Sequence, residues 1–410
     1  MVQSRRSFLI LGSLVAGGTL VLGSRQAYQF FRQNPNIPSD GLNASPTVQP
    51  EWSGFAIAHG KRELGKGNFF ASPRIDQKGM VLIGNYAGTQ IKEYKTNFVS
   101  HQIIQNPKRR TQFFGIQKWG LNAISMNLEN DEVTALELPE HHYFFGHGFC
   151  TLDGDFVLIS AMDMRSAEGQ LLVFETRSLK LVNKYRTYGV NPHDVQLSHD
   201  HKNILLIHGG NLPDEMKKTS QASRLNSCMT RLSADSGDLI SHIELDSGTL
   251  AYGHFLNIDD QQILCLGLQL ERGGRRSLPP ALAFLTQDRV EDLMVDSSLK
   301  SCEGEALSAR LVDASTALVT LPDSNTVVLF DFKQKNVKKT FFAQQPRGVA
   351  RLPTGDFLVS QSRQEKPFLV YKAVDQVTQD LQTYFQSPGE KRSSWVAVGA
   401  HMTEIAWPEF

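Results

Sequence analysis

The sequence predicts an all-β fold, a seven-bladed β-propeller of four-stranded blades preceded by an N-terminal export signal and a linker. The first observation is a β-hairpin pattern over residues 143–160, where two apolar runs flank the turn Leu152-Asp153-Gly154. The second is that the order of turn, apolar strand, polar turn and apolar strand recurs along the chain. The third is a period of roughly 40 to 50 residues, which is the length range of four-stranded propeller blades.

Seven copies of the hairpin pattern support this prediction. They cover residues 68–86, 100–104, 143–160, 192–210, 252–268, 305–321 and 346–362. The copy at 100–104 is the shortest and has the weakest turn signal. We therefore expect the copies to form one propeller domain and not several separate domains.

The two ends of this region are expected to close the ring. Residues 55–59 read as a lone strand, and residues 395–407 are again strand-like. A C-terminal strand that completes a blade begun at the other end of the chain removes an exposed sheet edge. Before that final strand, Val374, Val377 and Leu381 are spaced as on one face of a helix, so we predict a short amphipathic helix over residues 374–386.

The N-terminal segment predicts export. Ser4-Arg5-Arg6-Ser7-Phe8-Leu9 and the mostly apolar run to Gly23 resemble a twin-arginine signal, with Arg5 and Arg6 as its motif. Residues 1–24 are either a cleaved signal or a retained membrane anchor. Residues 25–53, with several prolines, read as a linker, and residues 54–410 as the propeller. The folded part is then periplasmic, and membrane contact is expected only through an uncleaved segment.

Composition narrows the classes of function. The chain has 410 residues, 42 basic and 42 acidic side chains and 40% hydrophobic residues, so it can bury a large core and is not patterned for nucleic acid. Cys150 and Cys265 fall inside predicted strands and read as small buried hydrophobes. Cys228 and Cys302 are left open, since an oxidising compartment would allow them to form a bridge.

Four histidines stand at the same place in successive hairpins. His101, His147, His193 and His254 are spaced by 46, 46 and 61 residues. Equivalent positions of propeller blades converge near the mouth of the central channel, where Glu305 and Arg347 are expected to join this arc. Neutral imidazoles are good transition-metal ligands. Two interpretations are open, a metal or small-ligand site and a set of structural histidines bonded within their own blades.

Other polar segments carry weaker signals. Residues 209–228 and the basic stretch 271–280 are insertions between strands, and each reads either as a solvated loop or as a functional one, the second able to hold an anion. His141 and His142, next to Glu140, either reach the channel mouth or decorate a loop. Signatures of serine hydrolases, phosphate-binding loops, zinc proteases, dinucleotide enzymes and c-type haem are absent from the sequence.

Three motifs carry a resemblance to a known family. Phe145-Gly146-His147-Gly148, Pro192-His193-Asp194 and Gly209-Gly210-Asn211, with the export signal and the sevenfold period, look like the DUF1513 family of exported propellers. Such proteins are similar to quinoprotein-type, YVTN-type and WD40-like propellers and are often encoded near periplasmic iron-uptake components. The resemblance therefore implies metal handling, although a shared fold does not by itself imply a shared function.

Two functions follow as hypotheses. The first is a non-catalytic periplasmic binding or scaffold protein, associated with metal (iron) uptake, that holds a metal, a small ligand or a partner protein. The alternative is a metal-dependent redox enzyme with a histidine-lined centre at the channel mouth. A lopsided arc of histidines suits a binding site better than an axial cofactor. The sequence identifies no cofactor, and a transition metal is the candidate that the histidines offer.

Overall fold

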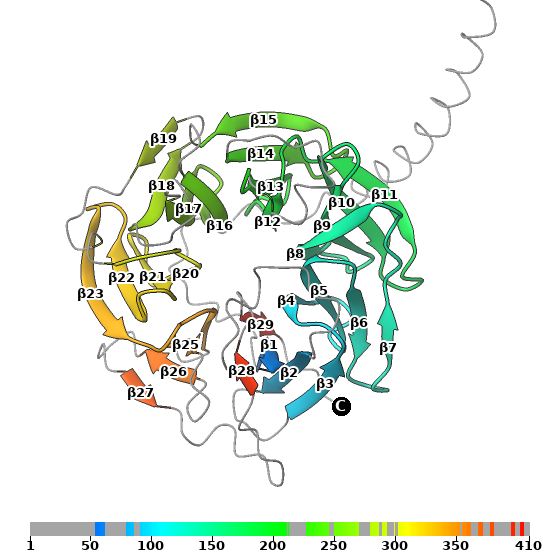
Figure 1. The fold of residues 1–410 in the computed structure, drawn as a ribbon, viewed down its shortest axis with the longest axis horizontal. Coiled ribbons are helices and arrows are strands. Elements are labelled where there is room, and N and C mark those ends of the chain that lie inside the picture. Colours follow the sequence, from blue (N-terminus) through cyan, green and yellow to red (C-terminus); the bar gives the residue numbers. More distant parts are fainter. Residues whose placement is uncertain are drawn as a thin grey trace, which may run out of the picture.

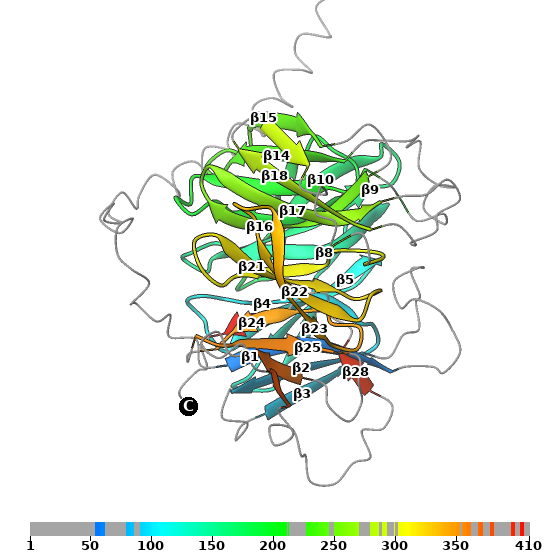
Figure 2. The same cartoon turned by 90° about the vertical axis from the view of Figure 1, so that its left-hand side faces the viewer.

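The protein forms a ring of antiparallel β-sheets around a central axis. The computed structural model describes residues 54–61, 79–85, 91–210, 212, 227–245, 250–269, 279–286, 289–292, 299, 302–352, 355–361, 368–371, 378–380, 395–397 and 402–405. Figure 1 looks down the axis of the ring, and Figure 2 shows it from the side. The fold is thus an all-β propeller, as the sequence predicts. The predicted signal (1–24) and linker (25–53) lie outside the described residues.

Four of the sheets are four-stranded meanders, in which each strand pairs with the next strand of the chain. The first contains β12 (Pro192–Leu197), β13 (Asn203–His208), β14 (Cys228–Ser233) and β15 (Leu239–Glu244). The second contains β16 (Leu250–Asp259), β17 (Gln262–Gln269), β18 (Pro280–Thr286) and β19 (Arg289–Asp292). The third contains β20 (Ser308–Leu311), β21 (Thr316–Leu321), β22 (Thr326–Asp331) and β23 (Asn336–Phe342). The fourth contains β24 (Val349–Arg351), β25 (Phe357–Ser360), β26 (Phe368–Tyr371) and β27 (Thr378–Asp380).

An eight-stranded sheet lies on the other side of the ring. Its strands are β4 (Ser100–Gln105), β5 (Gln112–Gly120), β6 (Ala123–Asn127), β7 (Val133–Ala135), β8 (His142–Cys150), β9 (Phe156–Asp163), β10 (Glu168–Glu175) and β11 (Leu181–Arg186). Within it, β4 to β7 and β8 to β11 each form a meander, and the two meanders are joined by a short pairing of Lys118 and Gly120 in β5 with Phe145 and Phe144 in β8.

The two ends of the propeller region meet in one sheet, which confirms the predicted closure of the ring. This sheet contains β1 (Gly54–Lys61), β2 (Gly79–Asn85) and β3 (Ile91–Thr96), together with two strands from the end of the chain, β28 (Trp395–Ala397) and β29 (Thr403–Ile405). Both C-terminal strands pair antiparallel with β1. The edge of β1 is covered in this way, so non-covalent strand pairing closes the ring.

One prediction is wrong, that of a helix before the C-terminal strands. Where the spacing of apolar residues predicts a helix over 374–386, residues 378–380 form β27, which pairs with β26. The backbone groups of β26 need partners on their outer side, and this requirement outweighs the helical pattern; the rest of the predicted helix lies outside the described residues.

Cys228 and Cys302, whose pairing the sequence left open, form no bridge, since all four cysteines are buried free thiols. No helix among the residues that the structure describes is long and apolar enough to cross a membrane.

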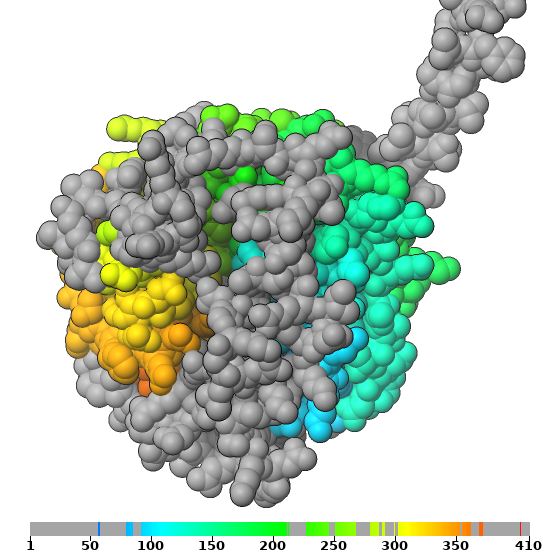
Figure 3. Space-filling view, viewed as in Figure 1, coloured from blue at the N-terminus to red at the C-terminus, as the bar shows by residue number. Residues whose placement is uncertain are grey.

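The core lies between neighbouring sheets. One apolar cluster joins residues of β17 and β18 to residues of β20, β21 and β22, and another joins β13 and β14 to β16, β17 and β18. Both faces of the second and third strands are therefore buried, as the runs Leu205-Leu206-Ile207 and Val327-Val328-Leu329 show. Figure 3 shows the described residues in cyan on one side of the molecule, green at the top and yellow to orange on the other side.

His208 is a buried ionisable group of this core. It is the last residue of β13, its side chain is fully buried, and it pairs with Cys228 in the neighbouring strand. Burial lowers the pKa of His208 to about 3, because the charged imidazolium loses its water, while the backbone of Cys228 opposes that shift. Folding is therefore favoured while His208 is neutral.

Removing the C-terminal strands is expected to open the ring. A chain ended after Arg392 loses β28, β29 and the fully buried Met402. Loss of a buried methionine side chain alone costs about 2 to 5 kcal/mol, so urea denaturation should show at least that decrease in the free energy of unfolding. A chain that lacks only residues 406–410 keeps both strands and serves as the control. Equal denaturation midpoints for the two truncated chains would contradict the closure role.

The pH dependence of stability should carry the signature of His208. The unfolded state binds a proton near pH 6.5 and the folded state only near pH 3, so stability contributed by the neutral group is present above pH 6.5 and decreases as the pH falls below it. At pH 5 the loss is about 2 kcal/mol. His208→Asn should reduce the loss between pH 7 and pH 5 by about this amount. The exposed His201, whose positive φ also tolerates Asn, gives the control His201→Asn, which should leave the slope unchanged.

Candidate metal centre

The innermost strands of four consecutive meanders change register at the same place. In β4 the shift falls between Ser100 and Gln102, and in β12 it falls between Pro192 and Asp194. In β8 it spans residues 144–148, and in β16 it falls between Tyr252 and His254. An extra residue in one strand of a pair bends that strand and redirects a side chain. A histidine stands at, or directly after, each of these irregularities.

The four histidines converge into one buried cluster, here called the His tetrad (His101, His147, His193 and His254). One ring nitrogen from each residue lies within 4.8 Å of the others. Neighbours along the arc have ring centroids 4.6, 5.5 and 4.8 Å apart, and the first and last rings stack at 6.1 Å. All four side chains are at most 5% exposed. The predicted convergence is therefore present in the structure.

The backbone at the tetrad is fixed locally. Ser160 in β9 accepts from the N–H of His147 at 3.3 Å and donates to its carbonyl at 3.0 Å, so one hydroxyl satisfies both groups that the irregularity removes from the ladder. Gly146 has φ +100°, and a Cβ added there would lie 2.9 Å from the ring of His101. Glycine is required at this position both for its conformation and for the close approach of the neighbouring imidazole.

Two carboxylates face the tetrad. Asp194 Oδ1 lies 3.5 Å from His147 Nδ1, and Glu305 Oε1 lies 4.0 Å from His254 Nε2. A carboxylate beside one ring nitrogen favours the proton on that nitrogen and leaves the lone pair of the other nitrogen for a metal. Burial raises the pKa of Asp194 to about 6, although the N–H of Phe255, the amide of Gln196 and the N–H of Val195 all favour its ionised form. Glu305 thus lies beside the arc, as predicted.

Lys118 brings a cation to the same cluster. Its Nζ lies 2.9 Å from Nε2 of His193. An ammonium group has only donors, so this bond uses the lone pair of that nitrogen. Lys118 and a metal ion bound to Nε2 of His193 would therefore exclude each other.

The tetrad fits one transition-metal ion after a small contraction. Metal-to-imidazole bonds of about 2.0 to 2.1 Å place four nitrogens about 3.3 to 3.4 Å apart in a tetrahedral arrangement, and about 2.8 to 4.2 Å apart in a square-planar one. The ring nitrogens of the tetrad lie up to 4.8 Å apart, and small rotations of the rings can bring them to these shorter nitrogen–nitrogen distances. A set of four imidazoles with neighbouring carboxylates and no thiolate suits copper, zinc, iron or nickel.

The remaining predicted positions are placed elsewhere or stay predictions. Arg347 fixes the backbone before β24, where its N–H donates to Ser360 O at 2.9 Å and its carbonyl accepts from Thr320 Oγ1 at 2.8 Å; a role for its side chain in the site stays a prediction. His141 contacts Arg165, and His142, the first residue of β8, bonds Gln170 at 3.0 Å, so neither histidine belongs to the tetrad. The insertions at 209–228 and 271–280 fall mostly outside the described residues.

Sequence reasoning missed four residues at the centre. Asp194 follows His193 directly, and a carboxylate beside a candidate ligand is a signal that could have identified it. Gln102 stands in the same position after His101, and its Oε1 accepts from the N–H of Gly148 at 2.8 Å, which joins two neighbouring innermost strands. Lys118 in β5 and Arg310 in β20 are lone basic residues in strands, and nothing in their sequence context points to the tetrad.

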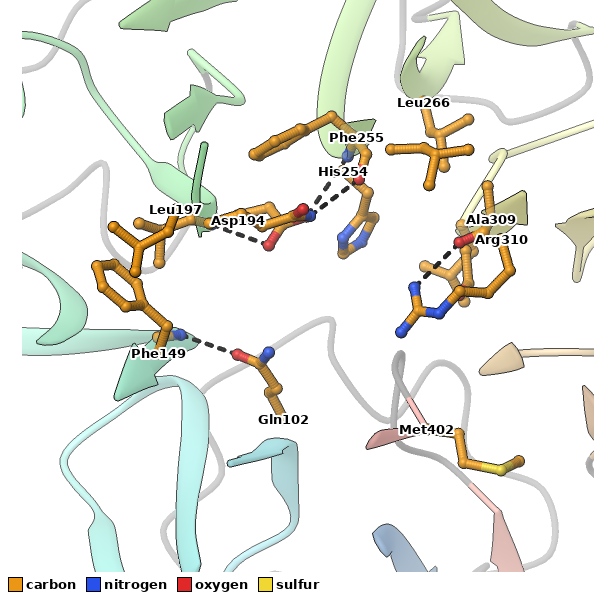
Figure 4. Close-up of a pocket in the computed structure, with 16 residues that line it drawn as sticks. Gln102, Phe149, Asp194, Leu197, His254, Phe255, Leu266, Ala309, Arg310 and Met402 are labelled. Atoms are coloured by element: carbon orange, nitrogen blue, oxygen red, sulfur yellow. Dashed lines mark hydrogen bonds between the residues drawn. The ribbon is translucent and has the colours of Figure 1, made fainter. Parts of the chain in front are cut away.

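A cavity of about 410 Å³ lies beside the tetrad and is lined by His254 and Asp194 among others. Figure 4 shows its lining side chains, with Asp194 and Arg310 on opposite sides of His254. One member of the tetrad therefore faces both the other histidines and this pocket.

Comparisons with known proteins add a family and distant folds. A family model described as "Protein of unknown function (DUF1513)" matches residues 98–392. No curated protein matches the chain. Similar solved structures include Kuenenia stuttgartiensis hydrazine synthase (11% identity, TM-score 0.40, 64% of this chain and 92% of that chain) and the WD40 β-propeller domain of Doa1 (9% identity, TM-score 0.48, 68% and 81%). A chain of the mitotic checkpoint complex is also similar (10% identity, TM-score 0.44, 70% and 86%).

The family match and the motifs agree. The matched region begins just before His101, includes all four histidines of the tetrad, and covers well over half of the chain. The chain therefore belongs to the DUF1513 family.

Proposed function

We propose that this protein is a metal-binding β-propeller whose His tetrad holds one transition-metal ion. The observation that carries the proposal is the convergence of four buried imidazoles from four separate strands, with donor atoms within 4.8 Å of one another. Histidines with structural roles would each turn into their own blade, whereas these four rings bring their nitrogens toward one another.

The surrounding charges support a cation. Asp194, beside His147, is almost fully buried, and Glu305 lies beside His254 with its side chain 17% exposed. Carboxylates that orient ligating imidazoles also offset the charge of the metal. The positive charge of Lys118 opposes binding of a cation. The lysine therefore either weakens metal binding, or its side chain moves away when the metal binds.

The biological setting is part of the proposal. We propose that the twin-arginine motif exports the chain to the periplasm, that the eight-stranded sheet counts as two blades in a ring of seven, and that the protein serves iron or other metal uptake without catalysis. The two meanders within the eight-stranded sheet support the blade count. The role in uptake rests on the resemblance to the family.

A second candidate is a metal-dependent redox enzyme. The observation that favours it is the cavity beside His254, because a catalytic metal needs an approach for a reactant as well as protein ligands. A binding protein that only holds its ion needs no such space. Turnover of a redox dye by metal-loaded protein, abolished together with metal binding, would select the enzyme.

Metal content should depend on the tetrad. Wild-type protein is stripped with a chelator and reloaded in separate samples with Fe(II), Cu(II) or Zn(II). We expect it to retain at least one of these metals at about one ion per chain, because imidazole is a suitable ligand for all three. His147→Ala/His193→Ala removes two of four ligands and should retain none after desalting, as measured by elemental analysis. The exposed pair His199→Ala/His201→Asn is the matched control and should bind as wild type does.

Thermal unfolding of the metal-free proteins distinguishes a metal site from a structural role of the histidines. If the tetrad is a metal site, the double tetrad variant still folds when metal-free and loses only its ability to retain metal. The metal proposal is wrong if wild-type protein retains no more of any of the three ions than this variant does. Where the double variant fails to fold, the single change His193→Asn provides the comparison.

Replacing Lys118 should tighten metal binding. Lys118→Met removes the ammonium that lies 2.9 Å from Nε2 of His193 and keeps most of the aliphatic volume. We expect the Kd for the metal, measured by competition with a chromophoric chelator, to fall at least about tenfold, which corresponds to 1.4 kcal/mol. Lys118→Arg retains the charge and should not show the gain, and the exposed Lys108→Met is the surface control. An unchanged or higher Kd in Lys118→Met would show that the lysine does not oppose the metal.

A further inference from the structure

The cavity beside the tetrad has a defined shape and a mixed lining. It is a half-open pocket of about 410 Å³ between the innermost strands β8, β12, β16 and β20, with Met402 from the C-terminal segment at one side. Ligand cavities in proteins span about 300 to 1,000 Å³, so the space suits a small organic molecule. Met402 belongs to the segment that closes the ring, so closure also completes the wall of the cavity.

Apolar side chains make up much of the wall. They are Phe149, Leu197, Phe255, Leu256, Leu266 and Leu307. Leu266 is almost fully buried, and Leu256 and Leu307 are buried as well. A short apolar chain of a ligand would be removed from water against these residues, which is favourable by about 25 cal/mol for each Å² of apolar surface buried.

Arg310 supplies the positive charge of the cavity. It lies in β20, and its Nη1 donates to the carbonyl of Ala309 at 3.1 Å. In Figure 4 its guanidinium points from β20 toward the space between His254 and Met402. A guanidinium presents its donors in a planar fork that matches a carboxylate, and bidentate pairs of this kind are among the stronger polar contacts in proteins.

The opposite wall does not offer an equivalent cation site. Asp194 accepts from the N–H of Val195 at 2.8 Å and, more distantly, from the N–H of Phe255 at 3.4 Å and Gln196 Nε2 at 3.3 Å. Its carboxylate is thus directed to its own and the neighbouring strand and to His147, and the positive charge of Arg310 also favours its ionised form. Gln102 likewise uses its Oε1 for the N–H of Gly148, which leaves its NH₂ group as the end able to donate to a ligand.

We infer that this cavity binds a small organic carboxylate, with the carboxylate group on Arg310 and a short apolar chain against the leucine and phenylalanine wall. The guanidinium disfavours cations, and the volume of about 410 Å³ excludes only ligands that are too large to fit it. The inference goes beyond the metal proposal, because carboxylate binding needs no metal. It also places the ligand next to His254, where it becomes a neighbour of any ion that the tetrad holds.

Calorimetric titration of metal-free protein with butyrate tests the inference. Wild-type protein should show saturable binding, and butylamine, which has the same chain with a positive group, should show none. Arg310→Gln is expected to raise the Kd for butyrate at least tenfold, and Arg310→Lys less, since it keeps the charge and loses the fork. Arg177→Gln, which changes an exposed arginine, should match wild type. Thermal unfolding checks that each variant is folded.

The outcomes separate this inference from the metal proposal. Equal binding of butyrate to wild type and to folded Arg310→Gln, equal binding of butylamine, or no binding to wild type would overturn the carboxylate site whatever the metal content. Conversely, butyrate binding that requires Arg310 in a protein that retains no metal would uphold the carboxylate site and leave the metal proposal refuted. Repeating the titration after metal loading then shows whether the two ligands influence each other.

Discussion

The register change near the start of each of four consecutive innermost strands is the constraint on which the rest of the site depends. A regular strand alternates its side chains between two faces, and both faces of a propeller strand are covered by neighbouring blades. A local irregularity releases one residue from this alternation and lets its side chain point toward the axis. Because it recurs in β4, β8, β12 and β16, four imidazoles meet in one place. The hydroxyl of Ser160 and the missing side chain of Gly146 make this backbone conformation possible at His147.

Connections between blades keep the irregular strands in position. Gln102 bonds the N–H that follows His147, and Asp194 receives the N–H that follows His254. In both cases the side chain that follows one histidine accepts the backbone N–H that follows another histidine. These hydrogen bonds connect the innermost strands of the arc to one another. Asp194 has a second function in the same series, since it faces Nδ1 of His147. Ring closure by β28 and β29 then fixes the distances between the first and the last blade.

The centre is asymmetric in both position and charge. The histidines come from four consecutive meanders, while the cavity extends toward β20 and Met402 on the other side of His254. Two carboxylates lie near the tetrad, Lys118 touches His193, and Arg310 faces the cavity. An ion in the tetrad and an anion in the cavity would thus lie next to each other with complementary charges. This arrangement is compatible with storage of a metal and with chemistry at a metal, and the two differ in whether the cavity ligand reacts.

The sequence by itself determined the propeller class, the hairpin units, the closing strand and the four recurring histidines, because these depend on periodic patterns that local physics imposes. It failed for residues 378–380, where the need of β26 for a pairing partner outweighed helical spacing. Only the tertiary structure decided that the four imidazoles share one buried point, that Cys228 and Cys302 stay apart as thiols, and that Asp194, Lys118 and Arg310 surround the centre. These contacts join residues from different blades, and their distances follow from how the sheets twist and pack around the axis, which no local pattern specifies.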